Sequence, residues 1–186
     1  MARVPARLEK KNCLLVVVDM QERFRDLIDD MDGVILACGR LIRFCDRLDI
    51  PIVVTEQYPR ALGRTVPDLA SLVSDYAPIE KLTFSCAGDR HFGARLQVLG
   101  RSQVILCGIE AHVCVYQTAF DLLAQGRQVA VAADAVSSRL PANRDLGLAR
   151  MRELGASVMP AEMIMFEILR EAGTADFKAV TDLLKG

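Results

Sequence analysis

The chain has 186 residues, of which 52% are hydrophobic, so it is long enough to bury a substantial core. Its 23 basic residues nearly balance its 24 acidic residues, and the formal net charge of −1 excludes a global field that would recruit nucleic acid or an anionic membrane. The apolar runs stay far below the ~20 residues of a membrane span, so we expect a small-molecule substrate and no membrane partner.

Short buried strands alternate with helical patterns in the first half of the chain. The continuous β-branched run over 13–18 is typical of a strand buried on both faces. A helical pattern over 32–48 follows, and Pro51 separates it from a strand over 52–54. One or two helical turns over 69–73 and an extended piece over 79–82 come next.

The same alternation continues in the second half. Asp89 is predicted to cap a helix that ends near Leu99, with Gly100 behind it. The remaining predicted strands cover 104–107, 129–133 and 156–159, and the remaining helices cover 113–125, 141–154, 161–170 and 174–184.

This alternation predicts an α/β fold. Five or six short strands separated by helices imply a mainly parallel, doubly wound, Rossmann-like sheet of about six strands with helices on both faces. The expected architecture is therefore a three-layer sandwich. Because the sequence shows no internal repeat or linker, we expect one domain over 1–186.

The cysteines indicate a reducing compartment. The chain has six of them, but residues 1–12 are charged and lack the apolar segment that secretion requires. Reduced cysteines inside apolar runs pack as small hydrophobic side chains. We therefore predict a cytoplasmic protein without disulfides.

Polar residues follow the predicted strands where each strand ends. Asp19, residues 55–57, Cys114 and Asp134 occupy such positions, and Lys81 lies near the third extended piece. Ligands of parallel α/β sheets bind outside the carboxyl ends of the strands. The sequence therefore predicts one crevice that gathers these side chains.

The residue types in this crevice favour nucleophilic catalysis. Cys114 lies where a predicted strand turns into a helix, and unpaired N–H groups at a helix start favour a thiolate and can receive an oxyanion. A thiol needs a base and a positive environment to act as a nucleophile, and Asp19 and Lys81 supply these. Taken singly, each residue also has a structural interpretation, as a cap, a surface charge or a packed thiol.

Three segments carry a family resemblance. Residues 18–24 (Val-Asp-Met-Gln-Glu-Arg-Phe), 80–85 (Glu-Lys-Leu-Thr-Phe-Ser) and 107–114 (Cys-Gly-Ile-Glu-Ala-His-Val-Cys) resemble the isochorismatase-like cysteine hydrolase family. Residues 55–59 (Thr-Glu-Gln-Tyr-Pro) and 134–139 (Asp-Ala-Val-Ser-Ser-Arg) resemble the subgroup called isochorismatase domain-containing proteins. The resemblance covers nearly the whole chain.

The resemblance implies a catalytic triad of Asp19, Lys81 and Cys114. It also implies a cis peptide bond between Ile109 and Glu110, which would direct the backbone N–H groups of Glu110 and Cys114 at an oxyanion. Family members commonly form dimers or larger assemblies, so a homo-oligomer is expected.

Two departures from relatives narrow the expected reaction. Nicotinamidases of this superfamily carry a metal site with paired histidines, but the loop over 56–65 has none, and the chain has only His91 and His112. No metal and no cofactor are therefore expected, and a structural or pocket-lining role is favoured for His112. Isochorismatases proper act on a vinyl ether and typically lack the nucleophilic cysteine, so Cys114 favours attack on a carbonyl or amide-like carbon.

These features lead to one hypothesis and one alternative. The hypothesis is a metal-independent cysteine hydrolase that cleaves a small amide-like or related C–N substrate through an acyl-enzyme. The substrate pocket is predicted to include Phe24, Gln57, Tyr58 and Val113, although Phe24 and Tyr58 equally fit the role of buried loop anchors.

The alternative is a redox-responsive protein that uses Cys114 as an oxidisable thiol. A dinucleotide site is disfavoured because the turn over 19–22 has no glycine.

Overall fold

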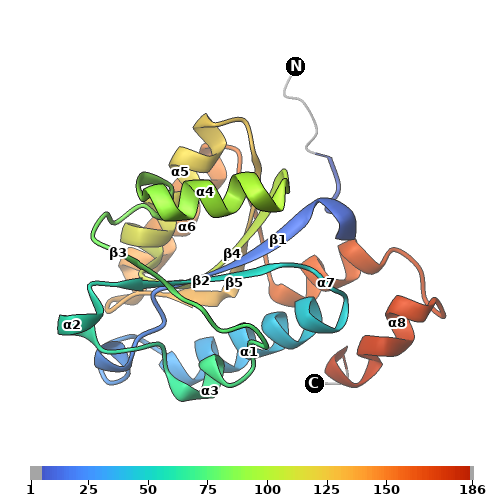
Figure 1. Cartoon of the computed structure of the whole chain (residues 1–186), viewed down its shortest axis with the longest axis horizontal. Helices are drawn as coiled ribbons and strands as arrows, with labels where there is room; N and C mark the ends of the chain where they lie inside the picture. Colours follow the sequence, from blue (N-terminus) through green and yellow to red (C-terminus); the bar gives the residue numbers. More distant parts are fainter. Residues whose placement is uncertain (1–5, 185–186) are drawn as a thin grey trace.

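The computed structural model describes residues 6–184, so part of the charged amino-terminal segment over 1–12 lies outside the described residues. One parallel sheet of six strands organises the chain, in the spatial order β3-β2-β1-β4-β5-β6 (Figure 1). The strands are β1 (Cys13–Val18), β2 (Ile52–Gln57), β3 (Ile79–Lys81), β4 (Gln103–Ile109), β5 (Gln128–Ser137) and β6 (Ser157–Met159). The predicted doubly wound α/β sandwich is confirmed.

Helices cover both faces of the sheet. They are α1 (Met31–Arg47), α2 (Pro59–Leu62), α3 (Pro67–Ala70), α4 (Arg90–Leu99), α5 (Tyr116–Ala124), α6 (Pro141–Glu153), α7 (Ala161–Leu169) and α8 (Ala175–Val180). Figure 1 shows α4, α5 and α6 on one side of the sheet and α1, α3 and α7 on the other. As predicted, the Asp89 side chain caps α4 by accepting from the N–H groups of His91 and Phe92.

The strand order has a topological switch between β1 and β4. From β1 the chain moves outward through β2 to β3, then returns to the other side of β1 and moves outward again through β4, β5 and β6. Loops that leave β1 and β4 therefore diverge to opposite faces. In open α/β sheets this divergence is where a ligand crevice forms, at the carboxyl ends of the two strands.

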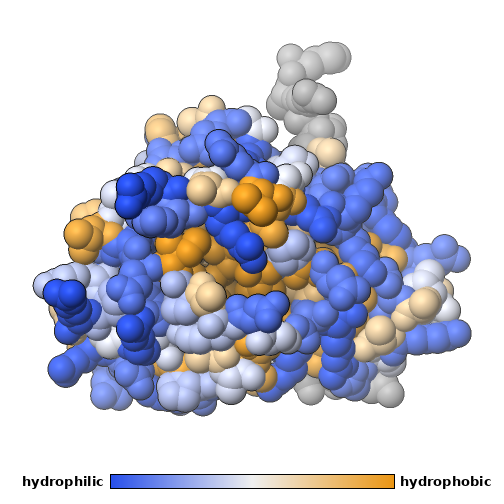
Figure 2. Space-filling model, in the orientation of Figure 1, coloured by the Kyte–Doolittle hydropathy of each residue, from blue (hydrophilic) through white to orange (hydrophobic). Residues whose placement is uncertain are grey.

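The core has two halves, one on each face of the sheet. Side chains alternate across a strand, so Leu15 and Val17 of β1 pack against α1 and α7, whereas Leu14 and Val16 pack against α4, α5 and α6. Every residue of β1 is buried, which explains its unbroken apolar sequence. Figure 2 shows hydrophobic residues gathered toward the middle of one face of the molecule, with hydrophilic residues around them.

Several element boundaries differ from the sequence prediction. Strand β2 extends to Gln57, so residues 55–57 lie at the end of the strand and not behind it. Strand β5 extends to Ser137, with an irregular register against β4, so Asp134 lies inside the strand and not behind it. Its carboxylate accepts a hydrogen bond of 2.7 Å from the N–H of Ala161, at the start of α7. The expected helix over 174–184 ends at Val180 and continues as a 3₁₀ turn. The start of the expected helix over 113–125 is a π-helical turn over Ala111–Val115.

Among residues 6–184, no helix combines the length and the apolar character that crossing a membrane requires.

Candidate active site

The register of the strands brings the predicted residues to one edge of the sheet. Val18, the last residue of β1, pairs with Thr55 on one side and with Gly108 on the other. On the next strand pair, Gln57 lies opposite Lys81. The ends of these strands therefore meet around Asp19, which directly follows β1.

Gly108 permits the close approach of β4 to β1 at this edge. Its φ of 108° is a conformation that other L-residues rarely adopt. A Cβ atom at this position would lie 2.1 Å from the carbonyl oxygen of Val18. A glycine is therefore required where the strand that leads to Cys114 passes the strand that leads to Asp19.

Asp19 and Lys81 form a buried ion pair. The Lys81 Nζ lies 2.6 Å from Asp19 Oδ2, and the two side chains are 0% and 2% exposed. Lys81 also donates to Gln57 Oε1 at 2.8 Å and to the carbonyls of Thr83 and Phe84, each at 3.2 Å. Burial acts to lower the pKa of Lys81, but the charge and hydrogen bond of Asp19, together with the nearby Cys86 and Cys114 thiols, outweigh burial and raise the pKa. The ammonium group therefore stays charged inside the protein.

The second carboxylate oxygen of Asp19 also has a donor. The Thr55 hydroxyl donates to Asp19 Oδ1 at 2.8 Å, and Thr55 is fully buried. Asp19 itself has a φ of 50°, in the left-handed region that is uncommon for residues other than glycine. Both oxygens are thus held in place, one by a side chain from β2 and the other by a side chain from β3.

Cys114 lies in the π-helical turn that follows β4. The N–H groups of Val113 and Val115 both donate to the carbonyl of Glu110, at 3.0 and 3.2 Å, and close this turn. Cys114 is 7% exposed. Burial raises the pKa of its thiol, the negative charge of Asp19 raises it further, and Lys81 opposes them. The resting side chain is therefore a thiol, and not the thiolate that the helix start alone would favour.

The turn that carries Cys114 is tied to the segment behind β5. The peptide bond between Ile109 and Glu110 is cis. The Glu110 carboxylate accepts from the N–H of Arg139 at 2.9 Å and from its Nε at 3.2 Å. His112 Nδ1 lies 2.9 Å from the Ser138 hydroxyl, within hydrogen-bond distance. These contacts give His112 and Glu110 a structural attachment on the side of the turn that faces β5.

Some of the predicted pocket residues use their side chains for contacts within the protein. Gln57 uses its amide to accept from Lys81 and to donate to the carbonyl of Leu82 at 2.9 Å. Phe24 is partly buried and packs against the core, as a loop anchor would. Tyr58 is 49% exposed, and Val113 is half-buried. Val113 packs against the other half of the core, so Tyr58 is the most exposed of the four predicted pocket residues.

Three further residues belong to the site without a role assigned from the sequence, and of these only Thr55 was placed in the predicted crevice. Thr55 contacts Asp19, and Cys86 Sγ lies 3.6 Å from the Thr55 hydroxyl. Gln21, fully buried, accepts from the N–H of Gln57 at 2.8 Å and donates to its carbonyl at 3.0 Å. The available signal was a polar triplet, 55–57, at the end of a strand whose other residues are apolar.

Among residues 6–184, no three His, Cys, Asp or Glu side chains come together as a group that would hold a metal ion. His91 lies on α4, and its neighbour within hydrogen-bond distance is the Arg90 side chain.

These observations define a class: a parallel α/β protein whose topological switch holds a buried Asp, Lys and Cys cluster. The sequence model of the isochorismatase domain matches residues 13–163. The chain belongs to the isochorismatase family, and this membership supports hydrolase activity in general.

Relatives of known sequence and structure agree with this assignment. Isochorismatase domain-containing protein 2 of Danio rerio is 38% identical over 178 residues, which cover 96% of this chain and 89% of that protein. A Phytophthora sojae protein named secreted isochorismatase effector Isc1 is 37% identical and covers 96% of this chain and 87% of its own length. The structure of MAR1 ribonuclease from Caenorhabditis elegans is 38% identical, has a TM-score of 0.92, and covers 97% of this chain and 93% of that one.

Proposed function

We propose that this protein is a metal-independent cysteine hydrolase that cleaves a small, uncharged amide-like C–N bond through an acyl-enzyme on Cys114. One observation carries the proposal. The Cys114 thiol lies near enough to Asp19 for the carboxylate to raise its pKa, and the same carboxylate pairs with a fully buried Lys81 ammonium at the switch point where ligands bind in this architecture. A thiol beside a base that is itself oriented by a third group is the arrangement of an activated nucleophile.

The first chemical step forms a bond between Cys114 Sγ and the substrate carbonyl carbon. Asp19 takes the thiol proton as this bond forms, so the thiolate never has to exist free in a buried site. The C=O electron pair moves to oxygen, where the N–H groups of Glu110 and Cys114 receive the charge. Collapse of the tetrahedral intermediate breaks the C–N bond, and Asp19 returns the proton to the leaving amine.

The second step removes the acyl group. Asp19 takes a proton from water, and the resulting hydroxide attacks the thioester carbonyl. The C–S bond breaks, the acyl group leaves as a carboxylic acid, and Asp19 returns its proton to the Cys114 sulfur. Lys81 remains charged throughout and holds the Asp19 carboxylate in one orientation.

Two further predictions belong to this proposal. The six cysteines are all free thiols, which supports a reducing compartment such as the cytoplasm. Met163 and Phe166 of α7 are 56% and 46% exposed, and we propose that such apolar positions are covered when the chain forms a homo-oligomer. We also propose that residues 1–186 act as one domain.

Cleavage of RNA is a second candidate, because a protein that is 38% identical is named a ribonuclease. The near-neutral charge of this chain disfavours it, since binding to a phosphate backbone depends on basic side chains. Incubation of purified protein with a labelled RNA distinguishes the two: RNA cleavage that survives in Cys114→Ser would come from a contaminant or another site.

The main test combines turnover with detection of the intermediate. The purified protein is incubated with a panel of small uncharged carboxamides, released ammonia is measured, and the reaction is quenched in acid for mass spectrometry. We expect at least one amide to be hydrolysed and an acyl group to be found on Cys114.

Cys114→Ser and Asp19→Asn serve as site variants, and Cys107→Ser changes a buried thiol outside the site. The proposal requires that activity disappears in the first two and persists in the third. Reversible oxidation of Cys114 without turnover of any amide would replace the hydrolase with the redox-responsive alternative.

A further inference from the structure

Beside the three triad residues, a short chain of hydrogen bonds ends on the Asp19 carboxylate. Thr55 Oγ1 lies 2.8 Å from Asp19 Oδ1 and 3.6 Å from Cys86 Sγ. Thr55 and Cys86 are both fully buried. Thr55 belongs to β2, whereas Cys86 lies in the 3₁₀ turn Cys86–Gly88 before α4. Two segments outside the triad thus converge on one side of the carboxylate.

The direction of these hydrogen bonds follows from the proton count. An Asp19 carboxylate paired with Lys81 has no proton to donate, so the single hydroxyl proton of Thr55 is directed at Oδ1. Thr55 Oγ1 then has only lone pairs for its other neighbour. The Cys86 thiol must therefore donate to Thr55, giving the order Cys86 S–H, Thr55 O–H, Asp19 carboxylate.

Cys86 suits the end of this chain because it keeps its proton. Burial and the charge of Asp19 raise its pKa to about 11. Its backbone is also fixed, since its N–H donates to the Thr118 hydroxyl at 2.9 Å. Thr118 lies on α5, four residues beyond Cys114, so the donor chain and the nucleophile are attached to the same helix.

We infer that Thr55 and Cys86 are positioning residues that fix the Asp19 carboxylate for proton transfer with Cys114. The inference rests on the proposed function, because it assigns Asp19 the role of base. Lys81 holds Oδ2 and Thr55 holds Oδ1, so rotation of the carboxylate breaks a hydrogen bond in a buried site. Each oxygen keeps a second lone pair, and these remaining lone pairs are available to the Cys114 proton.

The test measures how fast Cys114 adds to acrylamide, a small neutral amide that carries an electrophilic carbon. In this reaction Sγ bonds to the terminal carbon, and the proton held by Asp19 goes to the carbon next to the carbonyl. The adduct is counted by mass spectrometry from about pH 6 to about pH 9, a range over which bulk hydroxide takes over from an internal base.

Thr55→Val removes the donor and keeps the shape. We expect its rate at neutral pH to fall about tenfold, because a hydrogen bond to a charged group is lost. The loss should shrink toward alkaline pH, where solvent hydroxide can ionise the thiol directly. Thr55→Ser retains the hydroxyl and should restore most of the rate.

Cys86 gives a second, milder pair of variants. Cys86→Ser keeps a donor and should react at nearly the wild-type rate, whereas Cys86→Ala removes it and should react a few-fold more slowly at neutral pH. Cys45→Ala is the matched control, because Cys45 is equally buried but lies in the half of the core away from Asp19. Its alkylation profile should match that of the wild type.

The outcomes separate this inference from the proposed function. If Asp19→Asn slows alkylation but neither Thr55→Val nor Cys86→Ala changes the pH profile, the positioning role is wrong and the base remains. If Thr55→Ser is as slow as Thr55→Val at every pH, the effect is structural and the inference fails. If Asp19→Asn itself leaves the rate unchanged, the proposed function fails with it.

Discussion

The six buried cysteines divide into two groups on the two faces of the sheet. Four of them, Cys13, Cys38, Cys45 and Cys107, lie in the half of the core that faces α1 and α7. Cys86 and Cys114 lie in the other half, against α4, α5 and α6. All six are at most 7% exposed, so burial does not distinguish the groups.

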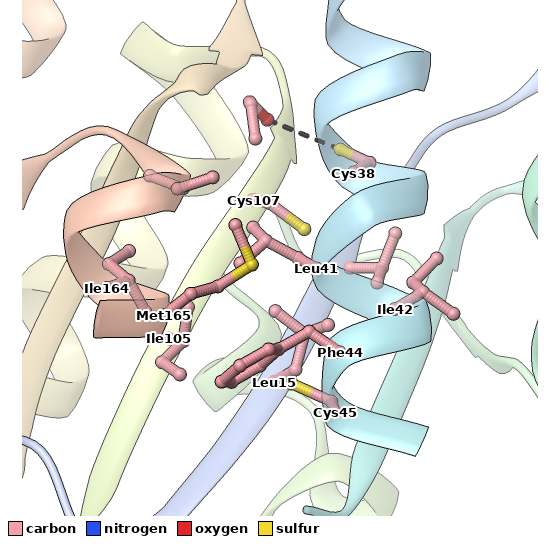
Figure 3. Close-up of a cluster of buried hydrophobic side chains, with 14 of the residues drawn as sticks. Leu15, Cys38, Leu41, Ile42, Phe44, Cys45, Ile105, Cys107, Ile164 and Met165 are labelled. Carbon is pink, nitrogen blue, oxygen red and sulfur yellow. Dashed lines mark hydrogen bonds between the residues drawn. The ribbon is translucent and has the colours of Figure 1, made fainter. Parts of the chain in front are cut away.

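The difference lies in what each thiol faces. Figure 3 shows Cys38, Cys45 and Cys107 among apolar side chains such as Phe44 and Met165. Cys38 donates to the carbonyl of Ala135 at 3.4 Å, and Cys107 to the carbonyl of Val16 at 3.7 Å. A backbone carbonyl accepts a hydrogen bond but does not take the proton. Cys114 instead faces the Asp19 carboxylate, which can do both.

Exchange of the nucleophile should give the largest effect. Cys114→Ser is expected to lower amide turnover by at least about a thousandfold, because the hydroxyl is a much poorer nucleophile without a matched base. Cys38→Ser, on the other face, should leave turnover per folded molecule unchanged. Ammonia release from the two purified variants measures the contrast, and equal losses would remove the distinction between the groups.

Loss of the base should affect both activity and stability. Asp19→Asn is expected to lower turnover by about 10² to 10⁴. It also leaves Lys81 charged and buried without its counter-ion, which should lower the free energy of unfolding by roughly 3–5 kcal/mol.

The double variant Asp19→Asn/Lys81→Met separates these two effects. Removing both charges should recover most of the free energy of unfolding, measured in urea, without recovering turnover. A double variant as unstable as Asp19→Asn would mean that the ion pair is not the source of the loss.

Both groups of cysteines should lower the stability of the folded protein at alkaline pH, because burial raises the pKa of thiols in each group. Burial raises the pKa of Cys13, in the first group, from 9.0 to about 11, and burial with the Asp19 charge does the same for Cys86 in the second. The folded state therefore favours the protonated thiols. Their stabilisation is complete below pH 9 and is lost as the pH rises toward about 11, at about 1.4 kcal/mol per pH unit for each thiol.

Urea unfolding at a series of pH values measures this slope. Cys13→Ala and Cys86→Ala should each flatten it by a similar amount, because an alanine has no proton to lose. A slope that neither substitution changes would assign the alkaline loss to other groups.

Cavity formation in the first group should give the smallest effect. Cys45→Ala leaves a small void beside Phe44 and is expected to cost about 0.5–3 kcal/mol of unfolding free energy. Turnover should not change. A large loss of turnover in this variant would mean that packing around Cys45 affects the site on the other face of the sheet, which is contrary to the separation described above.

Much of the fold was predictable because its signals are local. The apolar run of β1 and the capped helix α4 follow directly from residue type and spacing. The irregular middle of β5 was not predictable, because apolar alternation does not reveal the register shift that places Asp134 against α7. Periodicity also does not distinguish the π-helical turn at Cys114 from an α-helix.

The positions of the site residues were predictable, because functional side chains of a parallel sheet gather at the carboxyl ends of its strands. Their charge states and hydrogen-bond partners were not, because these depend on contacts between segments. Asp19, Lys81 and Cys114 stand at strand ends, so a parallel sheet brings them together. The charge state of Cys114 was not predictable, because it depends on burial and on the distance to Asp19. For the same reason Gln57 was expected against a substrate, whereas its amide holds Lys81.

We propose that proton transfer to Asp19 makes Cys114 the reactive thiol among the six buried cysteines. The most direct test is site-resolved alkylation of all six cysteines in the folded protein at neutral pH, comparing the wild type with Asp19→Asn/Lys81→Met. We expect one adduct, on Cys114, and its near-complete loss in the folded double variant. Equal labelling of Cys38 or Cys107, or an adduct on Cys114 that forms as fast without Asp19, would contradict it.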